Sequence, residues 1–283
     1  MGSKSIATLI ESANLSRLVR SPRWLKAFAG GTILCLFVYL LNVLFSEINA
    51  GNWWGLSYGT VATVLLLGAA LYGVRRRKLN YNVGRSLTWV QFHIYGGTIF
   101  MLLVFMHSGF QIPKGAMNFW LWALSLWVTV SGLAGVALQK LIPKMLTSGL
   151  AVEAVYERVP ELVIQIKDRA EKLAEVCSDP VRDFYQKHVA AALAAPSPRM
   201  IYYIDITGGI QSRMNQFDYL RKVLSTTEHQ KMEELRLLYK TKLELDAHYT
   251  LQRMLRLWLY THVPVSLVLL VLVALHIYTV WYY

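Results

Sequence analysis

Long apolar runs dominate this chain, and charged residues fall almost entirely between them. The runs cover about residues 27–45, 54–74, 87–109, 119–138 and 258–282. A helix needs roughly 20 apolar residues to cross the hydrocarbon core of a bilayer, whereas a helix on the surface of a soluble protein keeps one face polar. The pattern therefore predicts an all-α integral membrane protein with five transmembrane helices.

The composition supports this class of protein. Hydrophobic residues make up 55% of the 283 residues, charged residues make up only 16%, and the mean hydropathy is +0.36. The first apolar run follows a long segment with several basic side chains, and no small-x-small cleavage site comes after it. We therefore expect a retained first helix and not a signal peptide.

The segment between the fourth and fifth runs is too long for a plain connection. Residues 151–177 and 212–256 space their apolar residues as amphipathic helices do. Between them, AAPSPR predicts a break and MIYYIDITGG predicts a short strand that ends in a glycine turn. We expect an N-terminal segment with four transmembrane helices (1–138), a mainly helical insert (139–256) and a fifth transmembrane helix (257–283).

Basic residues lie mainly on one side of the predicted membrane. Between the third and fourth helices there is only Lys114, and between the first and second there is no Lys or Arg. The basic residues of the other side precede the first helix or follow the second: Lys4, Arg17, Arg20, Arg23, Lys26, Arg75, Arg76, Arg77, Lys78 and Arg85. The positive-inside rule then predicts a cytoplasmic N-terminus and insert and an external C-terminus, as in a bacterial inner membrane.

The net charge of +12 first raises the question of nucleic acid. The insert holds 18 Lys and Arg against 15 Asp and Glu, so it carries only +3 of that charge. The rest marks topology and suits contact with anionic membrane lipid. Because no basic and aromatic residues interleave in a nucleic-acid motif, we expect membrane lipid and no nucleic acid as a partner.

The two cysteines, Cys35 and Cys177, form no C-x-x-C or C-x-x-C-H motif, so any redox centre needs other ligands. Histidines meet that need, because His93 and His107 lie in the third run and His262 and His276 repeat the same spacing in the fifth. Fourteen helical residues rise about 21 Å and return to nearly the same face. The other three, His188, His229 and His248, lie in the insert, where a surface role is the ordinary one.

Two such helices, separated by one intervening span, run in the same direction. His93 then lies at the depth of His262, and His107 lies at the depth of His276. Haem iron takes one axial ligand on each face, so the spacing predicts two stacked haems, whereas a zinc site needs three or four ligands at one depth. A single histidine in a membrane helix could instead bond a neighbouring hydroxyl or line a proton path.

Further residues fit a haem site less specifically. Gly96 and Gly97 follow His93 and leave room for a flat ring, although small residues also serve helix packing. Arg85, Arg253 and Arg256 precede the histidines of the cytoplasmic side and could bind haem propionates, or they could simply mark topology.

The arrangement resembles the membrane-embedded di-haem b-type cytochromes, which include cytochrome b of the respiratory bc complexes and the cytochrome b subunits of hydrogenases and formate dehydrogenases. The four histidines, the glycines after His93 and the phrase THVPVSLVLLVLVALH carry the resemblance, which covers only the five helices. The resemblance implies the same pairing of ligands, His93 with His262 and His107 with His276. The PEWY tetrapeptide of the outer quinol site is absent, and the insert has no counterpart.

We therefore expect a cytochrome b subunit that conducts electrons across the membrane and acts as the electron-transfer subunit of a respiratory oxidoreductase complex. Its partners would be a quinone pool and an iron–sulfur, flavin or c-type cytochrome subunit. One alternative is a self-contained ferric or quinone reductase, which would need a substrate pocket at the outer haem beside Lys114. The other is a transporter or scaffold that uses the histidines for protons or packing.

Overall fold

The computed structural model describes residues 22–78, 85–149, 156–221, 224 and 228–282, which are almost entirely helical. The chain divides into two compact units. Unit 1 comprises residues 1–140 and 258–283, and unit 2 comprises residues 141–257, close to the insert expected at 139–256. The N-terminal segment, with Lys4, Arg17 and Arg20, lies outside the described residues.

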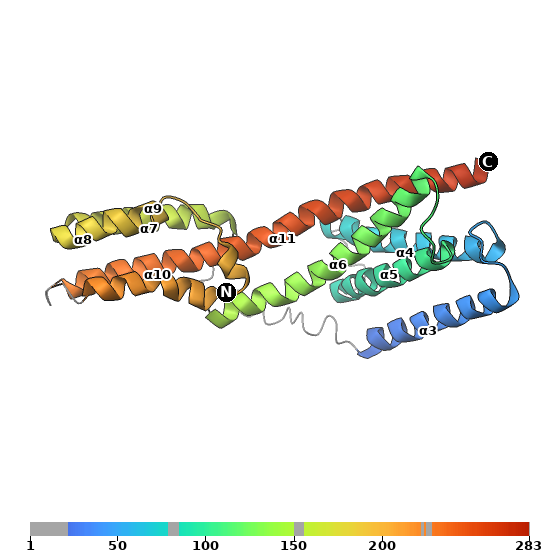
Figure 1. Cartoon of the computed structure of the whole chain (residues 1–283), viewed down its shortest axis with the longest axis horizontal. Coiled ribbons are helices and arrows are strands. Elements are labelled where there is room, and N and C mark those ends of the chain that lie inside the picture. The colour runs from blue at the N-terminus through green and yellow to red at the C-terminus, as the bar shows by residue number, and fades with distance from the viewer. Residues whose placement is uncertain (1–21, 79–84, 150–155, 222–223, 225–227, 283) are drawn as a thin grey trace. The chain divides into compact units, whose positions relative to one another are not determined.

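Among the described residues, unit 1 contains four helices and the last part of a fifth (Figure 1). In order they are α3 (Pro22–Phe45), α4 (Trp53–Lys78), α5 (Ser86–His107), α6 (Ala116–Gly149) and α11 (His229–Tyr282), with the end of α6 and the start of α11 belonging to unit 2. Within the described ranges, these five helices are long and apolar enough to cross a membrane. The expected all-helical class with five such helices is thereby confirmed.

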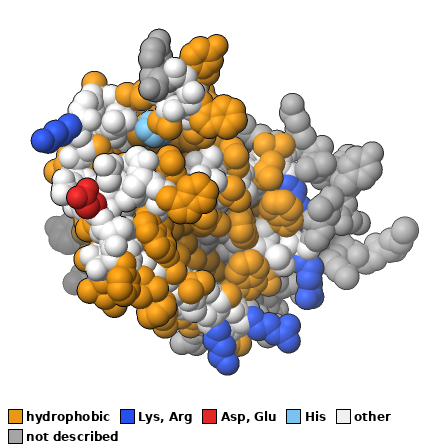
Figure 2. All heavy atoms as spheres, turned by 90° about the vertical axis from the view of Figure 1, so that its right-hand side faces the viewer, with side chains coloured by type: hydrophobic (Ala, Val, Ile, Leu, Met, Phe, Trp, Pro, Cys, Tyr) orange, Lys and Arg blue, Asp and Glu red, His pale blue; other side chains and the backbone are white. Residues whose placement is uncertain are grey.

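The surface of these helices is apolar as well as their interior. In α3, for example, Ile33, Phe37 and Leu44 expose more than half of their area, and little of the helix is buried. Figure 2 shows apolar side chains spread across the drawn face, with few charged ones between them. A soluble protein keeps such apolar patches small, so the surface is that of a chain surrounded by lipid.

The core of unit 1 ties its helices together. Tyr58, Ala62 and Leu66 recur every fourth residue on α4 and pack against α5. The buried residues of this core on α5 and α11 are Phe100, Leu103, Met106 and Leu269. Because partly buried residues of α3 and α6 complete the cluster, all five helices contribute to one core.

Unit 2 is built from helices of varied length. They are η1 (Tyr156–Arg158), α7 (Val159–Glu175), α8 (Asp179–Phe184), the π-helical turn η2 (Tyr185–Val189), α9 (Ala190–Leu193), η3 (Met200–Tyr203), α10 (Ile206–Arg221) and the first part of α11. Buried apolar residues of α7 recur at helical spacing, as the amphipathic pattern predicts. The residues of the insert at 150–155 lie outside the described ranges.

The strand expected at MIYYIDITGG is wrong, because this segment forms the 3₁₀-helix η3 and then the start of α10. The carboxylate of Asp205 accepts a hydrogen bond from the Gly208 amide at 2.8 Å, which is the bond of a helix N-cap. The two glycines therefore lie in the first turn of a helix and not in a strand-ending turn. An aspartate, a preferred N-cap residue, directly before ITGGIQ was the sequence signal for a helix start.

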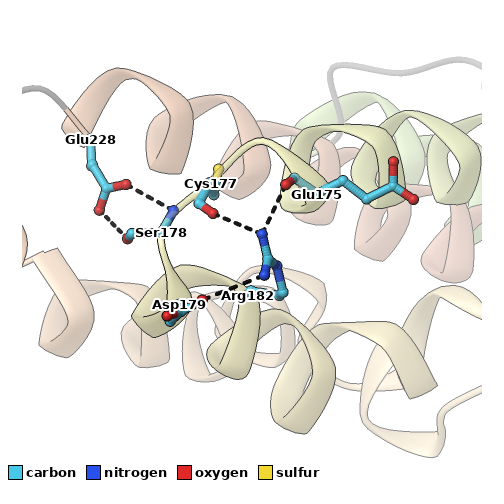
Figure 3. Close-up of polar contacts among 6 residues, drawn as sticks. All are labelled: Glu175, Cys177, Ser178, Asp179, Arg182 and Glu228. Atoms are coloured by element: carbon cyan, nitrogen blue, oxygen red, sulfur yellow. Dashed lines mark hydrogen bonds and ion pairs between the residues drawn. The ribbon is translucent and has the colours of Figure 1, made fainter.

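The turn between α7 and α8 is fastened from two sides (Figure 3). Arg182 donates to the carbonyl oxygens of Glu175 at 2.9 Å and Cys177 at 3.3 Å. Glu228, just before α11, accepts hydrogen bonds from the Ser178 amide at 2.9 Å and from the Ser178 hydroxyl. The beginning of α11 is thus joined to a turn that lies 50 residues earlier in the chain.

A buried ion pair lies inside unit 2. Lys242 Nζ donates to Asp246 Oδ2 at 2.7 Å, and both side chains are fully buried. Asp246 also accepts a hydrogen bond from the Ser197 amide at 2.9 Å, which attaches the segment before η3 to α11. Such a pair needs both partners, because either charge alone would be buried without compensation.

Candidate functional site

The four histidines of unit 1 meet as two pairs. The ring centroids of His93 on α5 and His262 on α11 lie 6.4 Å apart, with 75° between the ring planes. Those of His107 and His276 lie 6.3 Å apart at 82°. The first histidine of α5 therefore meets the first histidine of α11, and the second meets the second. This pairing requires α5 and α11 to run in the same direction.

The separations match those of two imidazoles on opposite sides of one metal ion. A metal–nitrogen distance of about 2.0 Å, plus roughly 1.1 Å from that nitrogen to the ring centroid, gives centroids about 6.2 Å apart. The observed 6.4 and 6.3 Å lie close to this value. In the described part of the chain, no third His, Cys, Asp or Glu joins either pair, so each offers two ligands.

Backbone carbonyls fix one ring nitrogen in each histidine of α5. His93 Nδ1 lies 3.0 Å from the carbonyl oxygen of Ala69, and His107 Nδ1 lies 2.8 Å from that of Gly55. A carbonyl can only accept, so Nδ1 carries the proton and the neutral ring keeps its lone pair on Nε2. A histidine that binds a metal through Nε2 is usually oriented by such a bond.

His262 is oriented by Ser131 of α6. Its Nδ1 lies 2.9 Å from the Ser131 hydroxyl oxygen, which itself donates to the Val128 carbonyl at 3.2 Å. Because the hydroxyl proton is used there, the oxygen accepts the proton of His262 Nδ1. Ser131 and His262 are both buried, at 9% and 8% exposure.

An indole stacks on the same imidazole. Trp258 lies one helical turn before His262, with ring centroids 5.5 Å apart and planes 26° from parallel. Its Nε1 donates to the Ser131 carbonyl at 2.7 Å. A Cβ at Gly135 would overlap this indole, so the missing side chain there makes room for Trp258. Ser131 thus holds the histidine directly and the tryptophan beside it.

The second pair is held less completely. Gly59 lies beside His107, where a Cβ would come within 3.1 Å of Nδ1. The helix ends directly after His107, and Gly109 adopts a φ of 62° that favours glycine. His276 differs from the other three, because its buried Nδ1 has no hydrogen-bond partner among the described residues.

The two expected glycines lie in different surroundings. A Cβ at Gly96 would meet the ring of Phe92, on its own helix, at 3.7 Å. A Cβ at Gly97 would meet nothing within 4 Å. Gly97 follows His93 by one turn and therefore lies on nearly the same face of α5, beside space that protein atoms do not fill.

The expected arginines are spread along the chain. Arg85 is exposed at the N-cap of α5, and Arg253 is exposed on α11. Arg256 is engaged inside unit 2, where it pairs with Glu157 and stacks over Tyr156 at 4.0 Å from the ring centroid. Lys114 is exposed in the connection between α5 and α6.

Sequence reasoning missed the residues that orient the rings. A serine in an apolar helix is a weak signal, and the partner carbonyls of Ala69 and Gly55 leave no sequence signal. The sequence signal near Ser131 was the glycine pair of TVSGLAGV, which indicates a close helix crossing. The pair does not identify the second helix or its contacting side chain, Trp258. Among the insert histidines, His188 packs against Phe184 with ring centroids 5.1 Å apart.

No protein-family model, curated protein or solved structure matches this chain. The geometry of the two histidine pairs is therefore the main indication of function.

Proposed function

We propose that this chain is a membrane-embedded di-haem b-type cytochrome that conducts electrons across the bilayer. His93 and His262 would hold one haem, and His107 and His276 would hold the other. The observation that carries the proposal is the pairing of four membrane histidines at centroid distances of 6.4 and 6.3 Å. When bound, haem iron supplies reversible one-electron oxidation and reduction.

The oriented nitrogens support this proposal over a packing role. Helix packing would need no particular tautomer, yet the acceptors Ala69 O, Gly55 O and Ser131 Oγ each select a ring with Nε2 available as a ligand. A proton path would instead require a chain of donors and acceptors that links the two depths. The pairs are separated by about 21 Å of helix, and the buried core residues Phe100 and Leu103 of α5 lie between them.

The apolar surroundings would set the properties of the two centres. Tyr72 packs against His93 with ring centroids 5.3 Å apart, and Trp258 covers His262. These side chains exclude water from the ligand rings, and the hydrogen bonds to Nδ1 raise the basicity of the ligands. The protein would thus control ligation, dielectric and spacing.

Single substitutions of the four histidines test the proposal. His262→Ala should abolish the optical signal of one haem and leave the other, and His276→Ala should do the reverse. His188→Ala is the matched control, because this histidine packs against Phe184 within unit 2 and belongs to neither pair, so both signals should stay intact. Spectra of equal haem content for all three variants and the parent would refute the assignment.

The proposal extends to a partner. Unit 2 would lie on the cytoplasmic side and receive a soluble redox subunit. The further partners of the chain would be a quinone pool and an iron–sulfur, flavin or c-type cytochrome subunit of the same complex. Excision of about residues 146–245 with a flexible linker should then leave both haem spectra normal and abolish turnover and co-purification of the partner. Turnover that survives the deletion would contradict docking there.

A further inference from the structure

Three large apolar side chains project from one short turn of unit 2. Met200 is 79% exposed, Ile201 is 45% exposed and Ile204 is 85% exposed. Single exposed apolar residues are common on protein surfaces, but three within five residues form a patch. We refer to Met200, Ile201 and Ile204 as the apolar turn.

The apolar turn is held firmly by its neighbours. Tyr202, between the exposed residues, is fully buried and anchors η3 in the core of unit 2. Just before the turn, the Arg199 amide donates to the Thr250 hydroxyl at 3.2 Å. Within it, the Ile204 amide donates to the Ile201 carbonyl at 3.0 Å. The exposed side chains are therefore presented by an ordered backbone.

The position of the turn along α11 follows from the pairing of α10 with α11. Asp218 of α10 lies 3.8 Å from Arg236, and Phe217 packs against Tyr239, while the start of η3 lies beside Thr250. Residues with higher numbers on α11 thus contact residues with lower numbers on α10 and η3, so α10 and α11 are antiparallel. Figure 1 shows α10 beginning at the end of unit 2 toward which α11 continues.

This register places the apolar turn near the beginning of the last membrane span. Thr250 precedes Trp258, the first residue of α11 in unit 1, by eight residues. Eight helical residues span about 12 Å, and even a fully extended chain of that length spans no more than about 29 Å. Trp258 and Tyr260 are residue types that gather at the membrane–water interface. The covalent link therefore limits how far Thr250, and the turn that is hydrogen-bonded beside it, can lie from the start of this span.

We propose that the apolar turn inserts into the headgroup region of the membrane that α11 crosses, so that unit 2 rests on the lipid surface. Exposed apolar side chains beside basic residues form the usual interfacial anchor. Arg253 is exposed one turn after Thr250 on α11, so it can meet lipid phosphates, and the half-buried Arg199 adjoins the turn. The nearby carboxylate of Asp205 is occupied as the N-cap of α10.

Spin labelling in lipid nanodiscs tests this proposal on the full chain. Ile204→Cys would carry the label in a Cys35→Ala, Cys177→Ala background. Leu237→Cys is the matched control, because Leu237 is an apolar residue of α11 that is 63% exposed and lies several helical turns before Trp258. The measurement is the accessibility of each label to oxygen, which concentrates in lipid, and to a water-soluble nickel chelate.

We expect oxygen to be favoured at residue 204 and the nickel chelate to be favoured at residue 237. Equal, nickel-favoured accessibility at both positions would overturn the proposal. Protection of residue 204 from both reagents would also overturn it, because a protein surface would then cover the turn. If the Ile204→Cys protein lacks the parent's helical circular dichroism, Met200→Cys gives the same readout at a side chain 79% exposed.

Discussion

Replacement of Ser131 by alanine removes one hydrogen bond from one ligand ring. The hydroxyl oxygen of Ser131 accepts from His262 Nδ1 at 2.9 Å, and alanine leaves this N–H without an acceptor. The neighbouring contacts survive, because Trp258 bonds the carbonyl of residue 131 and not its side chain. The substitution thus isolates the orientation of a single imidazole.

The size of the effect follows from burial. His262 is only 8% exposed, so water cannot readily replace the lost acceptor, and a buried donor left unpaired costs about 1–3 kcal/mol. Loss of a group that orients a metal-bound histidine lowers metal affinity by about 10–100-fold. That factor corresponds to roughly 1.4–2.7 kcal/mol, in agreement with the cost of the unpaired donor. We expect one haem to be held about 10–100-fold more weakly and the other to be unchanged.

The assay is the transfer of haem from the purified protein to an excess of an apoglobin acceptor, followed optically. Ser125→Ala is the control, because Ser125 is also buried on α6 but its hydroxyl donates to the Leu121 carbonyl at 2.7 Å. The Ser131 variant should release one haem faster than the parent, and the Ser125 variant should not. Equal release from the two variants would refute the role of Ser131.

Three further predictions concern unit 2 and topology. Lys242→Met leaves the buried Asp246 carboxylate without its ion-pair partner and should destabilise unit 2 by about 3–5 kcal/mol in thermal unfolding, whereas Lys167→Met, at the half-exposed pair with Glu171, should cost less than about 1 kcal/mol. Hydrogen bonds from the Ser178 hydroxyl and amide lower the pKa of Glu228 below its ordinary 4.5. This contribution to stability is complete above pH 4.5 and lost as the pH falls through the lowered pKa, so Glu228→Gln should flatten the acid unfolding curve there. Protease added outside sealed cells should leave the insert intact, and cleavage in it would reverse the proposed topology.

The sequence predicted the helical elements because lipid imposes a strong pattern. A run of apolar residues long enough to cross a bilayer can satisfy its backbone only as a helix, so α3 to α6 and the last part of α11 were visible at once. The equal spacing of the histidines in α5 and α11 also predicted which rings would meet. Two regular helices preserve their register from the first histidine to the second, and the ring pairs of the structure follow it.

Contacts that depend on helix crossings were not predictable. Ser131 reaches His262 only because α6 crosses α11 closely, with Gly132 and Gly135 beside the contact. The prediction of a strand at residues 200–209 failed because a short run of Ile and Tyr residues fits both a strand and a 3₁₀ turn, and burial of Tyr202 decides between them. The local sequence pattern predicts the periodicity of a helix, whereas tertiary packing decides which side chains of other elements it contacts.

Haem stoichiometry of the purified chain tests the central claim most directly. A pyridine haemochrome assay, referred to protein by amino-acid analysis, should give two non-covalent b-type haems per chain, and low-temperature electron paramagnetic resonance should show both as low-spin centres with two histidine ligands. One haem or none per chain, or a high-spin centre with a single histidine ligand, would contradict the assignment of His93 with His262 and His107 with His276.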